Sequence, residues 1–212
     1  MIHRIIIIAN GIVYPEICND VVKTDYIIGV DRAAYWLIQH RIVPNVAVGD
    51  FDSTSSDEMA QLVKRNIEIK RFPPEKDFTD SELAVRHAIS LSPKSIVIYG
   101  GSGTRLDHEL GVIHLLEICQ LAGIQAVFRN QTNEIAVIGR GRTILNKRRG
   151  SRYVSIVPIT QTIQVSLSGF KYNLSKKIIH RGQTIGISNE FIRNQADIMI
   201  HRGKSFVIQS SD

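Results

Sequence analysis

The chain has 212 residues, 43% of them hydrophobic and 22% charged, so it is long enough to bury a core and has the composition of an ordinary globular protein. No apolar run is long enough to span a bilayer, and the first residues enter a predicted strand with no signal-peptide cleavage site. Cys18 and Cys119 lack the spacing of a disulfide framework or a zinc site, so we expect a cytoplasmic protein.

The net charge of +6 is unevenly distributed along the chain. Residues 1–135 hold 13 Lys and Arg against 17 Asp and Glu, whereas residues 136–212 hold 13 against 3. An acidic front part and a basic rear part predict two domains with different roles.

Strand-like and helix-like segments alternate in the front part. Alternation of this kind predicts a mostly parallel sheet covered by helices on both faces. The first strand is closed by Asn10-Gly11, a typical turn pair. Strands are expected at 5–9, 26–30, 46–48, 67–71, 95–99 and 125–129, and helices at 33–38, 56–64, 79–89 and 107–121.

The pattern changes after Asn133, where short β-rich runs are separated by Gly and polar turns and no helix is expected. Such runs are typical of a small antiparallel sandwich or barrel. The expected fold is therefore an α/β three-layer domain over residues 1–135, followed by a β-sandwich domain over residues 136–212. Its strands are expected at 134–138, 142–145, 153–159, 163–167, 183–187, 196–201 and 205–209.

Aspartates follow several of the predicted strands. Ligands of open α/β sheets bind beyond the carboxyl ends of the strands, so acids at those ends should gather along one rim. Asp50 and Asp52 can point the same way if the backbone between them is extended. Capping and turns are the commonest roles of aspartate, but a cap needs only one of this pair. The acids expected at the rim are Asp31, Asp50, Asp52, Asp77, Asp80 and Asp107.

Clustered carboxylates repel one another and are normally neutralised by a cation or by basic side chains. Oxygen ligands favour a hard ion, and Mg²⁺ takes carboxylates together with substrate phosphates. The rim therefore predicts a site for one or two magnesium ions.

A glycine-rich turn marks the expected phosphate end of the site. Gly100-Gly101-Ser102-Gly103 lies between a predicted strand and a helix, where backbone N–H groups suit an anion, and Arg105 adds a cation. The chain has neither a Walker A motif nor a full GxGxxG, which argues against a P-loop or Rossmann site.

Four blocks taken together resemble the signature of thiamine pyrophosphokinases. They are Gly49-Asp50-Phe51-Asp52-Ser53, the segment 75–82, the segment 100–108 and Gly186-Ile187-Ser188-Asn189-Glu190-Phe191. The resemblance spans nearly the whole chain. Two positions depart from the family pattern: Arg32 stands where the family often has Gly, and Val112 stands where it usually has Asn.

The resemblance implies an α/β ATP-binding domain followed by a β-sandwich, in a homodimer that binds thiamine where the front domain of one subunit meets the β domain of its partner. It assigns Mg²⁺ and the triphosphate to Asp50, Asp52 and Asp80, with Asp77 and Thr79 alongside, and thiamine to Ser188 and Asn189. The ATP side would be lined by Asn10, Gly11, Asp31, Gly100, Gly101, Gly103, Arg105 and Asp107.

The expected reaction is in-line attack of the thiamine hydroxyl on the β-phosphorus of ATP, which releases AMP and forms thiamine diphosphate. Asp50, Asp52, Asp77, Asp80 and Arg105 are the expected catalytic residues, with Arg105 stabilising developing charge. Asp77 or Asp80 accepts the hydroxyl proton, and the sequence does not choose between them. His108 is expected to be structural.

Three alternatives remain at this stage. A hydroxymethylpterin pyrophosphokinase of similar fold would keep the chemistry and change the acceptor. A nucleotide sensor would need fewer acids. Nucleic-acid binding could use the basic residues of the rear part, but aromatic residues are sparse there and no RNA-binding motif is present, so we expect neither nucleic acid nor membrane as a partner.

Overall fold

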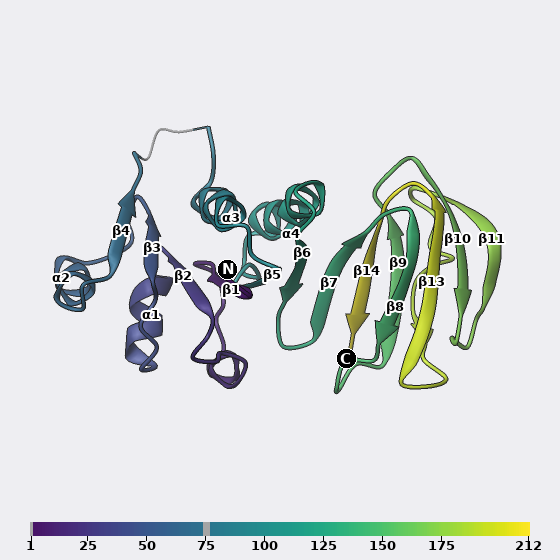
Figure 1. Ribbon diagram of the computed structural model, residues 1–212, viewed down its shortest axis with the longest axis horizontal. Helices are drawn as coiled ribbons and strands as arrows, with labels where there is room; N and C mark the ends of the chain where they lie inside the picture. Colours follow the sequence, from purple (N-terminus) through teal and green to yellow (C-terminus); the bar gives the residue numbers. More distant parts are fainter. Residues whose placement is uncertain (1, 74–76) are drawn as a thin grey trace. The chain divides into compact units, whose positions relative to one another are not determined.

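The computed structural model describes residues 2–73 and 77–212 (Figure 1). They form two compact units, Met1–Asn130 and Gln131–Asp212. Residues Glu75 and Lys76 of the second signature block lie outside the described residues.

The first unit contains six parallel strands in the order β6-β5-β1-β2-β3-β4. The four side chains of Ile5–Ile8 are all fully buried, which explains why the first strand is an unbroken apolar run covered on both faces. The strands are β1 (Arg4–Ile8), β2 (Tyr26–Val30), β3 (Val46–Gly49), β4 (Glu68–Arg71), β5 (Ser95–Tyr99) and β6 (Gln125–Arg129).

Helices cover both faces of this sheet, with α1 and α2 on one face and α3 and α4 on the other (Figure 1). The partly buried ring of Trp36 in α1 stacks on His40, with 3.8 Å between the ring centroids. The helices are the 3₁₀ helix η1 (Pro15–Asn19) and the α-helices α1 (Ala33–Gln39), α2 (Ser56–Lys64), α3 (Asp80–Ser90) and α4 (Leu106–Leu121).

An ion pair fixes the start of the sheet. Arg4 on β1 donates to both carboxylate oxygens of Asp25, from Nε at 2.9 Å and from Nη2 at 2.7 Å. Burial raises the pKa of Asp25, but the hydrogen bonds from Arg4 and from the Val22 N–H outweigh it and hold that pKa below its ordinary value of 3.8. The ion pair therefore contributes stability that depends on an ionised Asp25.

The second unit consists of two antiparallel sheets, with strand orders β12-β9-β14-β7 and β11-β10-β13-β8. Buried apolar residues of both sheets, such as Ile156 and Val207 from one and Val165 and Ile198 from the other, form one core, as in a β-sandwich. The strands are β7 (Asn133–Ile138), β8 (Gly141–Asn146), β9 (Tyr153–Pro158), β10 (Thr162–Ser168), β11 (Leu174–His180), β12 (Asn189–Glu190), β13 (Gln195–Arg202) and β14 (Ser205–Ser210).

The fold class expected from the sequence is confirmed, but the strands between β10 and β13 differ from those expected. The strand expected at 183–187 is wrong, since these residues form turns and irregular backbone. A strand that the sequence analysis did not expect, β11, pairs with β10, lies at the edge of its sheet and exposes Lys176 and Lys177. Charged residues are common on edge strands. In β11 they interrupt the alternation of apolar residues by which a strand is recognised in the sequence.

No helix among the described residues has the length and apolar character needed to cross a bilayer.

Candidate active site

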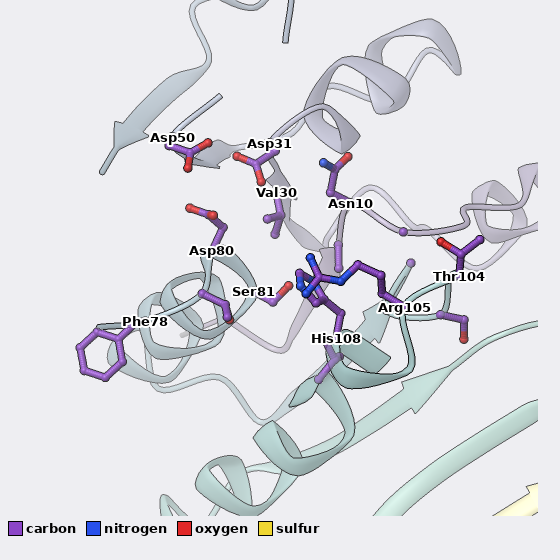
Figure 2. A pocket seen from close by; sticks show the side chains of 18 of the residues that line it. Asn10, Val30, Asp31, Asp50, Phe78, Asp80, Ser81, Thr104, Arg105 and His108 are labelled. Atoms are coloured by element: carbon purple, nitrogen blue, oxygen red, sulfur yellow. The ribbon is translucent and has the colours of Figure 1, made fainter. Parts of the chain in front are cut away.

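A cavity of about 570 Å³ lies at the carboxyl ends of the strands of the first unit (Figure 2). Loops that follow β1, β2, β3 and β5, together with the start of α3 and α4, form its walls, as expected for an open α/β sheet. Its lining residues are Ala9, Asn10, Gly11, Val30, Asp31, Asp50, Asp77, Phe78, Thr79, Asp80, Ser81, Gly100, Gly101, Ser102, Gly103, Thr104, Arg105, His108 and Val112.

Three carboxylates converge in this cavity. Asp31 at the end of β2, Asp50 after β3 and Asp80 at the start of α3 each offer an oxygen, and these oxygens lie within 4.8 Å of one another. Their side chains point toward one another in Figure 2. Three oxygen donors without nitrogen or sulfur suit a hard cation such as Mg²⁺. We call these three residues the carboxylate trio.

Asp31 is the buried member of the trio, with 8% of its surface exposed. Its backbone is left-handed, with φ 48°, and its N–H donates to the Val48 carbonyl at 2.9 Å. Its Oδ1 accepts a hydrogen bond from the Phe51 N–H at 3.3 Å. A Cβ on Gly49 would overlap this same oxygen, so the third strand must end in glycine for Asp31 to occupy its position.

Asp52 lies outside the trio and does not line the cavity. The residue between Asp50 and Asp52, Phe51, has φ 62°, so the backbone is not extended and the two carboxylates do not share one direction. The Asp52 N–H instead donates to Asp50 Oδ1 at 3.0 Å, and the Asp52 side chain is exposed. Asp31, which the sequence analysis placed on the ATP side, thus lies with Asp50 and Asp80, whereas Asp52 does not.

The start of α3 contributes Asp77, Thr79 and Asp80 to the cavity. Thr79 is the N-cap of α3, and its Oγ1 accepts a hydrogen bond from the Glu82 N–H at 3.2 Å. This cap fixes Asp80 in the first turn, where the helix N-terminus favours negative charge. Asp77 is exposed and lines the cavity without belonging to the trio.

The glycine turn after β5 packs against the loop after β1. The Gly11 N–H donates to the Gly100 carbonyl and the Ile12 N–H to the Ser102 carbonyl, both at 2.7 Å. A Cβ on Gly11 would overlap both carbonyl oxygens, so this close approach requires glycine. The pairing places Asn10 and Gly11 beside the turn on the cavity wall.

Arg105 and Asp107, both expected on the ATP side, form an exposed ion pair. Arg105 donates from Nη2 to Oδ2 of Asp107 at 2.6 Å and from Nε to Oδ1 at 3.2 Å. These hydrogen bonds lower the pKa of Asp107. Arg105 lines the cavity and Asp107 does not, so Asp107 holds the guanidinium rather than facing the cavity itself.

The sequence analysis missed several cavity residues. His108, which it treated as structural, lines the cavity from the first turn of α4, and Val112 lines it one turn further along. The Asp-His step of the third signature block was the signal for His108. Phe78 and Ser81 carry no comparable signal.

Ser188 and Asn189, expected to hold thiamine, lie in the second unit. Ser188 is exposed, has φ 57° and donates its N–H to Ser155 Oγ at 3.1 Å. Asn189 is buried: its Oδ1 accepts from the N–H groups of Tyr172 and Glu190, and its Nδ2 donates to the Tyr172 carbonyl. The Asn189 amide is therefore committed to holding the backbone around Tyr172.

Comparison with known proteins decides the family. Residues 19–128 match the model of the thiamin pyrophosphokinase catalytic domain, and residues 142–204 match that of the thiamin pyrophosphokinase vitamin B1 binding domain. The chain is 34% identical over 186 residues to thiamine pyrophosphokinase of Bacillus subtilis (strain 168), which covers 87% of each chain. The chain belongs to the thiamin pyrophosphokinase family.

Solved structures of this family agree with that assignment. The crystal structure of thiamine pyrophosphokinase from Bacillus subtilis matches with a TM-score of 0.93 at 32% identity and covers 99% of both chains. The thiamin pyrophosphokinase from Geobacillus thermodenitrificans matches with a TM-score of 0.90 at 30% identity and covers 99% of this chain and 98% of its own. The resemblance drawn from the four sequence blocks, and the thiamine pyrophosphokinase activity expected from it, are confirmed.

Proposed function

We propose that the cavity at the end of the parallel sheet transfers the pyrophosphoryl group of ATP to the hydroxyl of thiamine. The observation that carries this proposal is the convergence of Asp31, Asp50 and Asp80 in one cavity whose lining also includes the glycine turn and Arg105. The carboxylates can hold a metal ion, and the glycine turn and Arg105 can bind phosphates. Together these groups suit a metal-bound triphosphate.

Mg²⁺ would be held by the carboxylate trio, whose three oxygens and their spacing fit a hard cation. When bound, the ion neutralises phosphate charge and orients the phosphate chain. Asp52, which the resemblance assigns to Mg²⁺ and the triphosphate, remains a candidate for a second ion or a water-mediated contact.

The protein's own groups bind and orient the phosphates. Two kinds of group would bind the negatively charged phosphates: the backbone N–H groups of the turn Gly100–Gly103 and the guanidinium of Arg105. Asp107 keeps this guanidinium in place. Arg105 then stabilises the charge that develops as the bond between the β-phosphorus and the bridging oxygen to the α-phosphorus breaks.

Asp77 is the better proton acceptor of the two aspartates considered. Asp80 belongs to the trio and is committed to the metal, whereas Asp77 lines the cavity outside the trio. The thiamine hydroxyl oxygen attacks the β-phosphorus, its proton passes to Asp77, and AMP departs with the bridging oxygen.

The remaining parts of the proposal come from the family resemblance. Ser188 contacts thiamine, Asn189 supports that contact, and the chain forms a homodimer, which analytical ultracentrifugation tests. Use of ATP favours a location in the cytoplasm.

Incubation of the purified chain with ATP, Mg²⁺ and thiamine tests the function. We expect equimolar AMP and thiamine diphosphate, and no product when EDTA is added. AMP release with a hydroxymethylpterin but not with thiamine would show that the pterin is the acceptor. Formation of ADP instead of AMP would contradict pyrophosphoryl transfer.

A further inference from the structure

We propose that Phe51 is a positioning residue for the carboxylate trio. Its buried ring holds the turn after β3 in the left-handed conformation that places Asp50 in the cavity and offers a hydrogen-bond donor to Asp31. This inference rests on the proposed function, because it concerns the same metal site.

The backbone at Phe51 adopts a conformation that an aromatic residue rarely takes. Its φ of 62° lies in the left-handed region, which glycine enters freely and bulky residues disfavour. Such a conformation persists only where the surrounding structure imposes it, and it is commonest at functional sites. Something other than local preference must therefore hold this turn.

The ring of Phe51 supplies that restraint. It is 4% exposed and packs in a cluster with Ala34 and Ile38 of α1 and Leu62 of α2. The guanidinium carbon of Arg71 lies over the ring, 5.7 Å from its centroid. Release of the left-handed turn would pull the ring out of this cluster, so the burial of the ring offsets the cost of the backbone.

The restraint acts directly on two members of the trio. The Phe51 N–H donates to Asp31 Oδ1, and the following N–H, of Asp52, donates to Asp50 Oδ1. Both donors keep these directions only while φ of Phe51 is positive, because a change to an ordinary φ rotates the peptide groups on either side of it. The ring thus fixes the directions of Asp31 and Asp50 through hydrogen bonds from the backbone.

Direct metal binding tests this role without relying on catalysis. Mn²⁺ binding to the nucleotide-free protein is measured by electron paramagnetic resonance for the wild type and for the substitutions Phe51→Ala, Phe51→Val and Phe51→Leu. We expect Phe51→Ala and Phe51→Val to weaken binding by about tenfold or more, the range seen when groups that orient metal ligands are removed. Phe51→Leu keeps a large apolar side chain that is not branched at Cβ, and it should bind within about threefold of the wild type.

The variant Leu37→Ala is the control for general stability. Leu37 on α1 is fully buried in a different cluster of the first unit, which does not include Phe51. It should lose stability through the cavity it creates and still bind Mn²⁺ as the wild type does. Melting temperatures confirm that each variant is folded, and if Phe51→Ala fails to fold, the comparison of Phe51→Val with Phe51→Leu decides.

The outcomes separate this inference from the function on which it rests. If Phe51→Ala and Phe51→Val bind Mn²⁺ as tightly as the wild type, the positioning role is wrong and the proposed function stands. If Leu37→Ala weakens binding as much as Phe51→Ala, the effect is one of general stability and the role is again wrong. If the wild type binds no Mn²⁺, or if Asp80→Asn binds it as tightly as the wild type, the metal site itself fails, and this inference fails with it.

Discussion

Oδ1 of Asp31 occupies the space that a Cβ on Gly49 would need. The two residues end neighbouring parallel strands, so one absent methyl group on β3 admits a carboxylate from β2 into the cavity. The identity of residue 49 therefore controls the position of a carboxylate of the trio that follows another strand.

Substitution Gly49→Ala should displace Asp31 and impair both stability and turnover. We expect a loss of about 1–3 kcal/mol in the free energy of unfolding, as for other overpacked positions. Turnover should fall by about 100-fold, because a shift of about 1 Å in a catalytic group has that effect. Urea unfolding and the AMP-release assay measure the two effects. In the control Gly111→Ala, on the exposed face of α4 with no atom near the added methyl, stability should rise by about 0.5–1 kcal/mol.

Substitutions of Asp80 and Asp52 should have unequal effects on the magnesium requirement. Asp80 belongs to the trio, so Asp80→Asn should raise the Mg²⁺ concentration for half-maximal turnover by about 10–100-fold. Asp52 is exposed and outside the trio, so Asp52→Asn should have a smaller effect. Magnesium titrations of turnover compare the two, and equal shifts would show that Asp52 is a ligand, as the sequence analysis expected.

Loss of Arg105 should lower kcat more than it raises the KM for ATP. Its guanidinium lines the cavity and, in the proposed mechanism, stabilises charge in the transition state, so Arg105→Ala should reduce kcat by about 10²–10³. Asp107→Asn keeps an oxygen acceptor but loses the charge that holds Arg105, and it should mainly raise the KM for ATP. Steady-state kinetics at saturating Mg²⁺ separate the two effects; an unchanged kcat in Arg105→Ala would remove Arg105 from the chemistry.

Stability should depend on acid pH through Asp25. The folded state holds the pKa of Asp25 below 3.8, so its contribution is complete above that value and is lost as the pH falls through the lower, folded-state pKa. The free energy of unfolding of the wild type should therefore fall more steeply below about pH 4 than that of Asp25→Asn. Urea titrations at several pH values measure this slope. Asp57→Asn, an exposed change on α2, should follow the wild type.

Asn189 should matter for the stability of the second unit before it matters for thiamine. Its amide satisfies the N–H and carbonyl of Tyr172, and Asn189→Ala leaves these groups unpaired at a cost of about 1–3 kcal/mol. Ser188→Ala changes an exposed side chain and should raise the KM for thiamine with little change in stability. If Asn189→Ala raised that KM while the unfolding free energy stayed the same, Asn189 would be a direct thiamine contact.

The sequence predicted the parallel sheet and the edge of it that carries the cavity. Both predictions rest on local patterns, namely continuous apolar runs and the residues that follow each run. It placed Asp50 and Asp80 on the same cavity for the same reason. It did not predict that Asp31, rather than Asp52, lies beside Asp50 and Asp80, because the direction of Asp52 depends on the sign of one torsion angle at Phe51, which is set by packing against other elements.

Side-chain partners were also beyond the reach of the sequence pattern. An aspartate at position 107 could either face ATP or hold Arg105, and the sequence is the same in both cases. The geometry of the ion pair between Arg105 and Asp107 shows the second arrangement. The edge strand β11 was missed because Lys176 and Lys177 interrupt its apolar alternation, although Ile179 on that strand is fully buried.

Trp36 is the only tryptophan of the chain, and it lies on α1, five residues beyond Asp31. Its ring stacks on His40 and packs against a core cluster, and all of these residues lie in the first unit. Intrinsic tryptophan emission therefore reports the unfolding of the catalytic-domain unit alone, while circular dichroism reports both units. A substitution in either unit can thus be assigned to the part that it destabilises without attaching a label.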